Sequence, residues 1–261
     1  MQLRVRAELV YVFQSATQVL ASIEPAMSVD QTVLSESITV GDGVAIVRDF
    51  DEATGQRQIR TCLSGDVTIL YEGVVENGTR PLLPAKAREH VWSELPLGCL
   101  PFLLPSRFCP SDKFMRFAQR EFSGLPDGAA KVGAVVGWIH EHVDYVAGVS
   151  TAETTAERTF VDHAGVCRDF MHLGITLCRA LNIPARAVSA YAWQLNPPDF
   201  HAVFEVYLEG HWWLVDPTGL APVEGIVRIG CGRDAADIAF MTTSSNCECR
   251  KVAVSVEQLA P

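Results

Sequence analysis

The sequence predicts an α+β fold in which a β-rich N-terminal domain precedes a domain of helices and antiparallel strands. Residues 1 to about 80 alternate apolar and polar side chains at period two, which is typical of strands. From about residue 111 apolar side chains recur every three or four positions, as in helices, and strand-like segments follow. A proline-rich stretch lies between. We therefore divide the chain into residues 1–80, 81–110 and 111–261.

The N-terminal segment has the pattern of short strands joined by turns. In LRVRAELVYVF, the apolar side chains fall on one side: Leu3, Val5, Ala7, Leu9, Tyr11 and Phe13. Residues 37–51 and 58–78 continue with β-branched runs interrupted by Gly-Asp, Thr-Gly and Asn-Gly pairs. Several strands with a turn every ten or so residues predict a β-sandwich for residues 1–80.

Residues 81–110 contain six of the fourteen prolines of the chain: Pro81, Pro84, Pro96, Pro101, Pro105 and Pro110. Proline has no backbone N–H to donate, so such a stretch cannot form a regular helix or a central strand. We expect residues 81–110 to connect the two domains without belonging to either core. A connection of this kind would also be the first site of limited proteolysis.

The third segment alternates between helical and strand-like patterns. Helices are expected over 111–122, 129–143, around 154–161 and over 164–181, where Asn182 and Pro184 end the last one. Strands are expected over 185–193, 201–208 and 211–216. This order predicts helices that pack on an antiparallel sheet.

Composition limits the classes of partner. The formal net charge is −10 and the pI is near 5.1, which disfavours nucleic acid or an anionic membrane as the main partner. The N-terminus lacks the unbroken apolar core of a signal peptide, and no segment has the roughly 20 apolar residues of a membrane span. We expect a cytoplasmic protein whose eight cysteines are reduced.

No metal or cofactor is expected. The cysteines form no C-x-x-C pair, and only Cys247 and Cys249 are close in sequence, so a zinc site has little support. The acidic residues are scattered and show no EF-hand spacing. The oligomeric state is left open.

Cys167 begins one of the expected helices, two residues after Gly165. A helix N-terminus stabilises a thiolate through unpaired N–H groups and the helix dipole, and the same N–H groups can hold an oxyanion. A buried, inert cysteine is nevertheless the commoner case, and Cys178 fits that description. Position alone does not distinguish the two cysteines.

A histidine and an aspartate supply the distinction. If the strands 201–208 and 211–216 are joined by a two-residue turn, Leu208 faces His211. His201 and Asp216 then become diagonal neighbours on one face, about 7–8 Å apart at the backbone. A carboxylate at this position could orient the imidazole as a general base. The pattern favours Cys167, His201 and Asp216 as a catalytic triad.

Three segments found together in this order resemble the bacterial transglutaminase-like proteins, a branch of the papain-like cysteine enzymes. They are GVCRDFMHLGITLCRALNIPARAVSAY, HAVFEVYLEGHWWLVDPTG and IGCGRDAAD. The first sixty to eighty residues also resemble the β-rich N-terminal region of that branch. The resemblance implies a papain-like catalytic domain over 111–261 and the triad Cys167, His201 and Asp216. It does not identify the second oxyanion donor, for which Trp193 and Tyr191 are candidates by proximity.

The resemblance implies acyl transfer on an amide of a peptide or protein through a thioester on Cys167. We favour hydrolysis, as in a cysteine protease or amidase, because water needs no second dedicated site. Cross-linking of the transglutaminase type uses the same triad and stays an alternative. A non-catalytic peptide-binding module is a further alternative, but such a protein would be expected to have lost one of the three residues.

Overall fold

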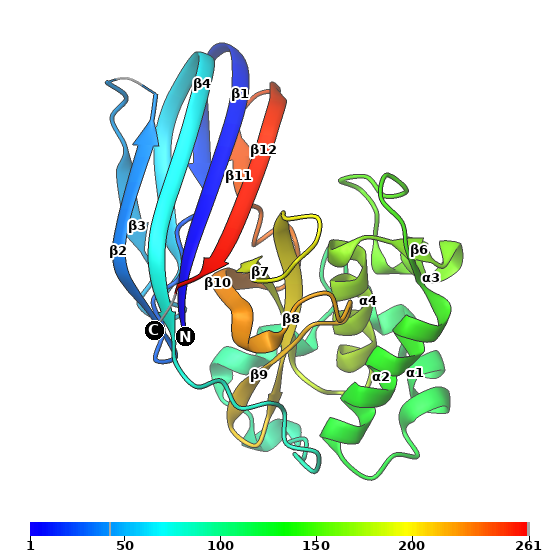
Figure 1. Ribbon diagram of the computed structural model, residues 1–261. Helices are drawn as coiled ribbons and strands as arrows, with labels where there is room; N and C mark the ends of the chain where they lie inside the picture. The colour runs from blue at the N-terminus through cyan, green and yellow to red at the C-terminus, as the bar shows by residue number, and fades with distance from the viewer. Residues whose placement is uncertain (42, 260–261) are drawn as a thin grey trace.

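The computed structural model describes residues 1–41 and 43–259. Figure 1 shows an N-terminal sheet of long strands on one side, a second sheet in the middle and the helices on the other side. The N-terminal sheet packs against the middle sheet, and the helices cover the opposite face of the middle sheet. The predicted fold class, a strand-rich N-terminal region before an α+β domain, is confirmed.

The N-terminal sheet is antiparallel and has the strand order β11-β1-β4-β2, with β12 also paired to β1 and β3 paired to β4. Its strands are β1 (Gln2–Ala21), β2 (Gln31–Val40), β3 (Val47–Phe50), β4 (Arg57–Asn77), β11 (Met241–Thr243) and β12 (Cys247–Gln258). The expected inward side chains of β1 are all buried, because every second residue points to the core.

Hydrogen bonding in the N-terminal region is continuous, so its strands form one sheet instead of two separate stacked ones. The reason lies in the length of β1 and β4, which have 20 and 21 residues. Gly65 and Asp66, which resemble a turn signal in the sequence, lie within β4 opposite an irregularity between Phe13 and Thr17 of β1. Gly65 has φ +72°, which its missing Cβ allows, and the strand continues through the irregularity.

The C-terminal boundary of the predicted domain 111–261 is wrong. Strand β12 pairs antiparallel with β1, from Leu3 opposite Gln258 to Phe13 opposite Cys247, and β11 pairs with the end of β1. The chain therefore returns to the N-terminal sheet after completing the helices and the middle sheet. As a result, the beginning of β1 and the end of β12 lie side by side (Figure 1).

The proline-rich residues 81–110 do not lie outside the cores, contrary to expectation. They form the short 3₁₀ helices η1 (Trp92–Glu94) and η2 (Leu97–Leu103), and η3 (Ser111–Lys113) follows. Cys99 and Leu103 are buried against Tyr207, and Cys109 belongs to the helical core. Proline prevents backbone ladders but leaves side chains free to pack, and so the segment lies on the protein surface as a packed strap.

The middle sheet is antiparallel with the order β10-β7-β8-β9. Its strands are β7 (Ala185–Ala192), β8 (Phe200–Leu208), β9 (His211–Val215) and β10 (Ile226–Gly232), and the 3₁₀ helix η4 (Val223–Gly225) precedes β10. The helices are α1 (Met115–Phe122), α2 (Gly128–His142), α3 (Ala156–Asp162) and α4 (Cys167–Ala180). Helix α4 is the central one: it packs on Phe204 and Val206 of β8 and contacts the other three helices.

The two-residue strands β5 (Asp144–Tyr145) and β6 (Ala164–Gly165) pair in parallel just before α4. They bring the loop after α2 beside the N-terminus of α4, with Tyr145 opposite Gly165. Within the described residues, no helix is both long and apolar enough to cross a membrane.

Candidate active site

Cys167 is the first residue of α4, as the sequence predicted, and its side chain is partly exposed. The start of the helix is fixed by Asp169, whose Oδ2 accepts a hydrogen bond of 2.8 Å from the backbone N–H of Val166. Gly165 makes room for this cap, since a Cβ there would lie 2.6 Å from the Asp169 Cβ. Asp169 thus holds the first turn and leaves Cys167 free to meet a substrate.

Cys178 differs from Cys167 in every relevant respect. It lies in the middle of α4, is fully buried, and burial raises the pKa of its thiol to about 12. Such a thiol stays protonated at neutral pH and is a poor nucleophile. The prediction that Cys178 is an inert core residue is confirmed by its burial.

His201 and Asp216 meet across the β8–β9 hairpin. The expected register is confirmed, with Leu208 opposite His211. His201 Nε2 and Asp216 Oδ2 are 3.0 Å apart, and the two side chains are 0% and 3% exposed. Because both groups are excluded from water, their hydrogen bond is stronger than it would be at the surface. The carboxylate therefore fixes the orientation of the imidazole ring.

Asp216 is itself held by the turn that follows it. Its Oδ1 accepts hydrogen bonds from the backbone N–H and the hydroxyl of Thr218, at 2.9 and 2.7 Å, and its Oδ2 accepts one from Ala221 N–H at 3.2 Å. Burial alone would raise the pKa of Asp216, but the hydrogen bonds from His201 and Thr218 lower it. Asp216 thus stays ionised, and its carboxylate accepts hydrogen bonds both from the turn and from the imidazole of His201.

The environment of His201 favours the imidazolium form. Burial opposes the charge, but the hydrogen bond to Asp216 and the interaction with the Cys167 thiol outweigh it and raise the pKa of His201 to about 9. Nδ1 is buried and has no hydrogen-bond partner among the described residues. It is consequently the ring nitrogen that can exchange a proton with Cys167. The structure brings all three predicted residues together.

Tyr145 is a site residue that the sequence did not identify. Its backbone lies opposite Gly165 in the β5–β6 pair, and its ring contacts Phe170 with centroids 5.7 Å apart. Burial and the Cys167 thiol raise the pKa of the Tyr145 phenol to about 12, whereas the Cys167 backbone N–H acts in the opposite direction. The phenol is therefore close enough to Cys167 for the two groups to affect each other, and at neutral pH it is protonated.

The two candidates for the second oxyanion donor occupy other positions. Tyr191 is buried in the core between the sheets, where its hydroxyl donates to the Ile23 carbonyl at 2.6 Å and its ring stacks on Tyr71. Trp193 packs against Gly225, and its backbone N–H donates to the Gly225 carbonyl at 3.0 Å. The hydroxyl proton of Tyr191 is already donated to Ile23, and among the described residues neither candidate is hydrogen-bonded to Cys167.

Among residues 1–41 and 43–259, no group of three or more His, Cys, Asp or Glu side chains is arranged to hold a metal ion.

Helix α2 contacts the turn after Asp216. His140 Nε2 lies 2.8 Å from the carbonyl oxygen of Pro217, the residue after Asp216. Helix α2 thereby supports the turn that carries the carboxylate.

Comparison with known proteins places this site in a family. A family model described as the transglutaminase-like superfamily matches residues 116–217, which include all three predicted residues. A candidate cysteine protease from Cytophaga hutchinsonii, known from its crystal structure, is 34% identical, and the alignment covers 100% of this chain and 91% of that one with a TM-score of 0.95.

Two further similarities cover parts of the chain. The protein ML0607 of Mycobacterium leprae is 27% identical over 191 residues, which are 67% of this chain and 66% of that protein. The periplasmic domain of TgpA from Pseudomonas aeruginosa is 18% identical over 85% of this chain and 91% of that chain, with a TM-score of 0.44. The Cytophaga protein matches the chain over its full length, and the family model matches the segment that contains the site. The chain therefore belongs to the transglutaminase-like superfamily.

Proposed function

We propose that the protein is a cysteine-nucleophile enzyme that cleaves an amide of a peptide or protein through a thioester on Cys167. The observation that carries the proposal is the buried His201, which is hydrogen-bonded to Asp216 on one side and faces the Cys167 thiol on the other. The description of the Cytophaga relative as a candidate cysteine protease supports the same chemistry.

In the first half-reaction, Nδ1 of His201 takes the proton of the Cys167 thiol. The thiolate attacks the amide carbonyl carbon, and a carbon–sulfur bond forms while the carbonyl oxygen becomes an oxyanion. The imidazolium then donates its proton to the amide nitrogen, the carbon–nitrogen bond breaks, and the amine leaves. Asp216 stabilises the imidazolium throughout and keeps Nδ1 directed at the sulfur.

The oxyanion needs donors that are in place before it forms. The Cys167 backbone N–H at the start of α4 is one, since the first N–H groups of a helix have no partner within the helix. The second donor in our proposal is the hydroxyl of Tyr145, a residue near Cys167 whose phenol carries its proton at neutral pH. Tyr145 thereby fills the role for which Trp193 and Tyr191 were the sequence candidates.

In the second half-reaction, His201 accepts a proton from water, and the hydroxide adds to the carbonyl carbon of the thioester to give a second oxyanion. The carbon–sulfur bond then breaks, the acid product leaves, and the thiolate of Cys167 is regenerated beside the imidazolium of His201. We favour water as the acceptor because it requires no further binding site.

Transfer to an amine is the second candidate, and one observation favours it. Asp199 is exposed and lies two residues before His201. Its charge raises the pKa of Tyr145, and its own pKa is raised by burial and lowered by the nearby His201. Its Oδ1 accepts a hydrogen bond of 2.7 Å from the Phe200 N–H, and the ionised carboxylate would attract a protonated amine, such as a lysine side chain.

The test is product analysis with a peptide library in water labelled with ¹⁸O, with and without a primary amine. Hydrolysis places ¹⁸O in the new carboxylate, whereas transfer gives a product with the mass of the added amine. A Cys167→Ala variant is the control and should form neither product. Turnover by that variant at the rate of the wild type would refute the proposed function.

A further inference from the structure

A crevice separates the N-terminal region from the face of the middle sheet that is turned away from α4. Its volume is about 460 Å³, which is within the range of small-ligand sites. The segment 26–30 forms one wall, and β9 and β10 form the other. Because Phe204 and Val206 of β8 face α4, Glu205 between them points to the opposite side and into this crevice.

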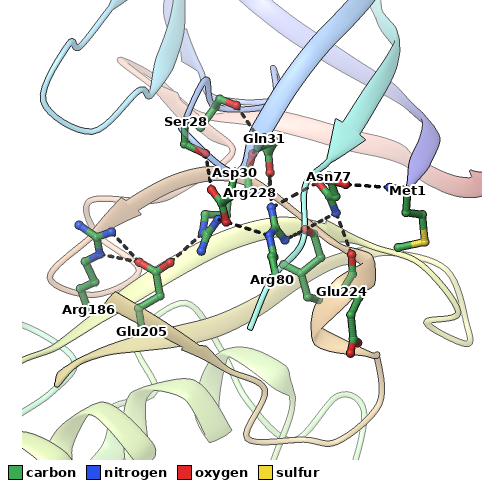
Figure 2. Close-up of polar contacts among 12 residues, drawn as sticks. Met1, Ser28, Asp30, Gln31, Asn77, Arg80, Arg186, Glu205, Glu224 and Arg228 are labelled. Carbon is green, nitrogen blue, oxygen red and sulfur yellow. Dashed lines mark hydrogen bonds and ion pairs between the residues drawn. The ribbon is translucent and has the colours of Figure 1, made fainter. Parts of the chain in front are cut away.

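Buried and partly buried charged side chains line the crevice. They form an alternating chain of arginines and carboxylates, as Figure 2 shows. Arg186 Nε and Arg228 Nε donate to the two oxygens of Glu205, at 2.6 and 2.7 Å. Arg228 Nη1 and Arg80 Nε donate to Asp30 Oδ2, at 2.7 and 3.0 Å. Three guanidinium groups therefore face two carboxylates. The cluster keeps one positive charge that no acidic side chain within it neutralises.

The arginines of this cluster also keep unused donors. Among the described residues, Nη1 of Arg186 and Nη2 of Arg228 have no hydrogen-bond partner. Arg186 is held in place by Glu205 and by the ring of Trp212, above which its guanidinium carbon lies at 4.1 Å. Since its orientation is already fixed, a ligand would lose little affinity to ordering this side chain.

We propose that the crevice binds a small carboxylate through Arg186 and Arg228. One carboxylate supplies the single negative charge that the cluster lacks. A phosphate dianion would overcompensate that charge and be repelled by Asp30 and Glu205. The apolar walls at Leu214 and Val223 suit a carboxylate with a hydrocarbon body. The site is separate from the chemistry at Cys167 and does not depend on the proposed function.

The test is calorimetric titration of the whole protein with sodium hexanoate, against sodium chloride at equal ionic strength. We expect saturable binding of one hexanoate, and inorganic phosphate should bind at least tenfold more weakly. Two tripeptides, with a free or an amidated C-terminus, distinguish the sources of the carboxylate. Tighter binding of the free peptide than of hexanoate would indicate a peptide terminus, and equal or weaker binding would indicate a free small acid.

Two variants and a control complete the experiment. Arg186→Gln removes one donor and should weaken hexanoate binding about tenfold or more. Val29→Glu adds a negative charge to a fully exposed residue of the crevice wall, which cannot disturb packing, and should weaken binding severalfold. Arg60→Gln alters an exposed pair with Asp49 elsewhere and should have no effect. Absence of saturable binding, phosphate binding as tight as hexanoate, or unchanged affinity in Arg186→Gln and Val29→Glu would overturn the proposal.

Discussion

Tyr145→Phe removes one hydroxyl from the candidate site and leaves the ring that packs on Phe170. Loss of one oxyanion donor costs about 10²–10³ in turnover in enzymes where it has been measured. Tyr145 is 46% exposed, so water can enter and replace part of the lost interaction. We therefore expect a fall in kcat/KM of about 10², at the lower end of that range.

The assay compares two reactions of the same thiol. Amide cleavage passes through an oxyanion, whereas alkylation of Cys167 by iodoacetamide does not. Tyr145→Phe should slow amide cleavage and leave the alkylation rate within about threefold of the wild type, measured at a pH where that rate has reached its plateau. Tyr207→Phe, the same change at a residue buried away from Cys167, is the matched control and should alter neither rate. Cleavage within about threefold of the wild type, or an equal fall in both rates, would refute the role assigned to Tyr145.

Three further predictions concern the charged groups. Asp216→Asn should lower turnover by about two to four orders of magnitude. It should also lower the melting temperature, because the hydrogen bonds from Thr218 are weakened. Unchanged turnover with a lower melting temperature would remove Asp216 from the triad. The pKa of His201 is raised from 6.5 to about 9, so its contribution to stability is complete below pH 6.5 and is lost as the pH rises through about 9. Urea unfolding should show this loss in the wild type and not in His201→Gln, and identical pH profiles would contradict it. Glu205→Gln leaves two partly buried arginines without a charged partner, Glu205 itself being buried, and should lower the free energy of unfolding by about 3 kcal/mol. A loss under about 1 kcal/mol would mean that the cluster is hydrated.

Local patterns were enough to predict the β8–β9 hairpin of the candidate site and the start of α4. The two-residue turn at Glu209 and Gly210 fixes the register of β8 and β9, and that register places His201 beside Asp216. The cap of α4 likewise joins two groups close in sequence, since Asp169 lies three residues after Val166, from whose N–H it accepts a hydrogen bond. Short-range rules apply to such features because the interacting groups are close along the chain.

Pairings between strands far apart in the chain could not be predicted from the sequence. The alternation in β12 fits the edge of any sheet, and nothing within it specifies β1, more than 230 residues earlier, as its partner. Tyr145 reaches Cys167 through a pairing only two residues long, too short to leave a periodic signal. An aromatic residue directly after an amphipathic helix and shortly before the cysteine helix is the one trace of it in the sequence. The packing of Cys99 and Leu103 could not be predicted from the prolines around them, because proline restricts the backbone and does not determine where neighbouring side chains pack.

The most direct test of the central claim is to trap the acyl group on the enzyme. The wild-type protein is mixed with a peptide p-nitrophenyl ester, quenched in acid within the first turnover, and mapped by mass spectrometry. Our account predicts one acyl mass on Cys167, removed by hydroxylamine as a thioester would be, and no acyl group on Cys178 or in Cys167→Ala. An acyl group on another residue, or release of p-nitrophenol by Cys167→Ala at the rate of the wild type, would contradict the assignment of Cys167 as the nucleophile.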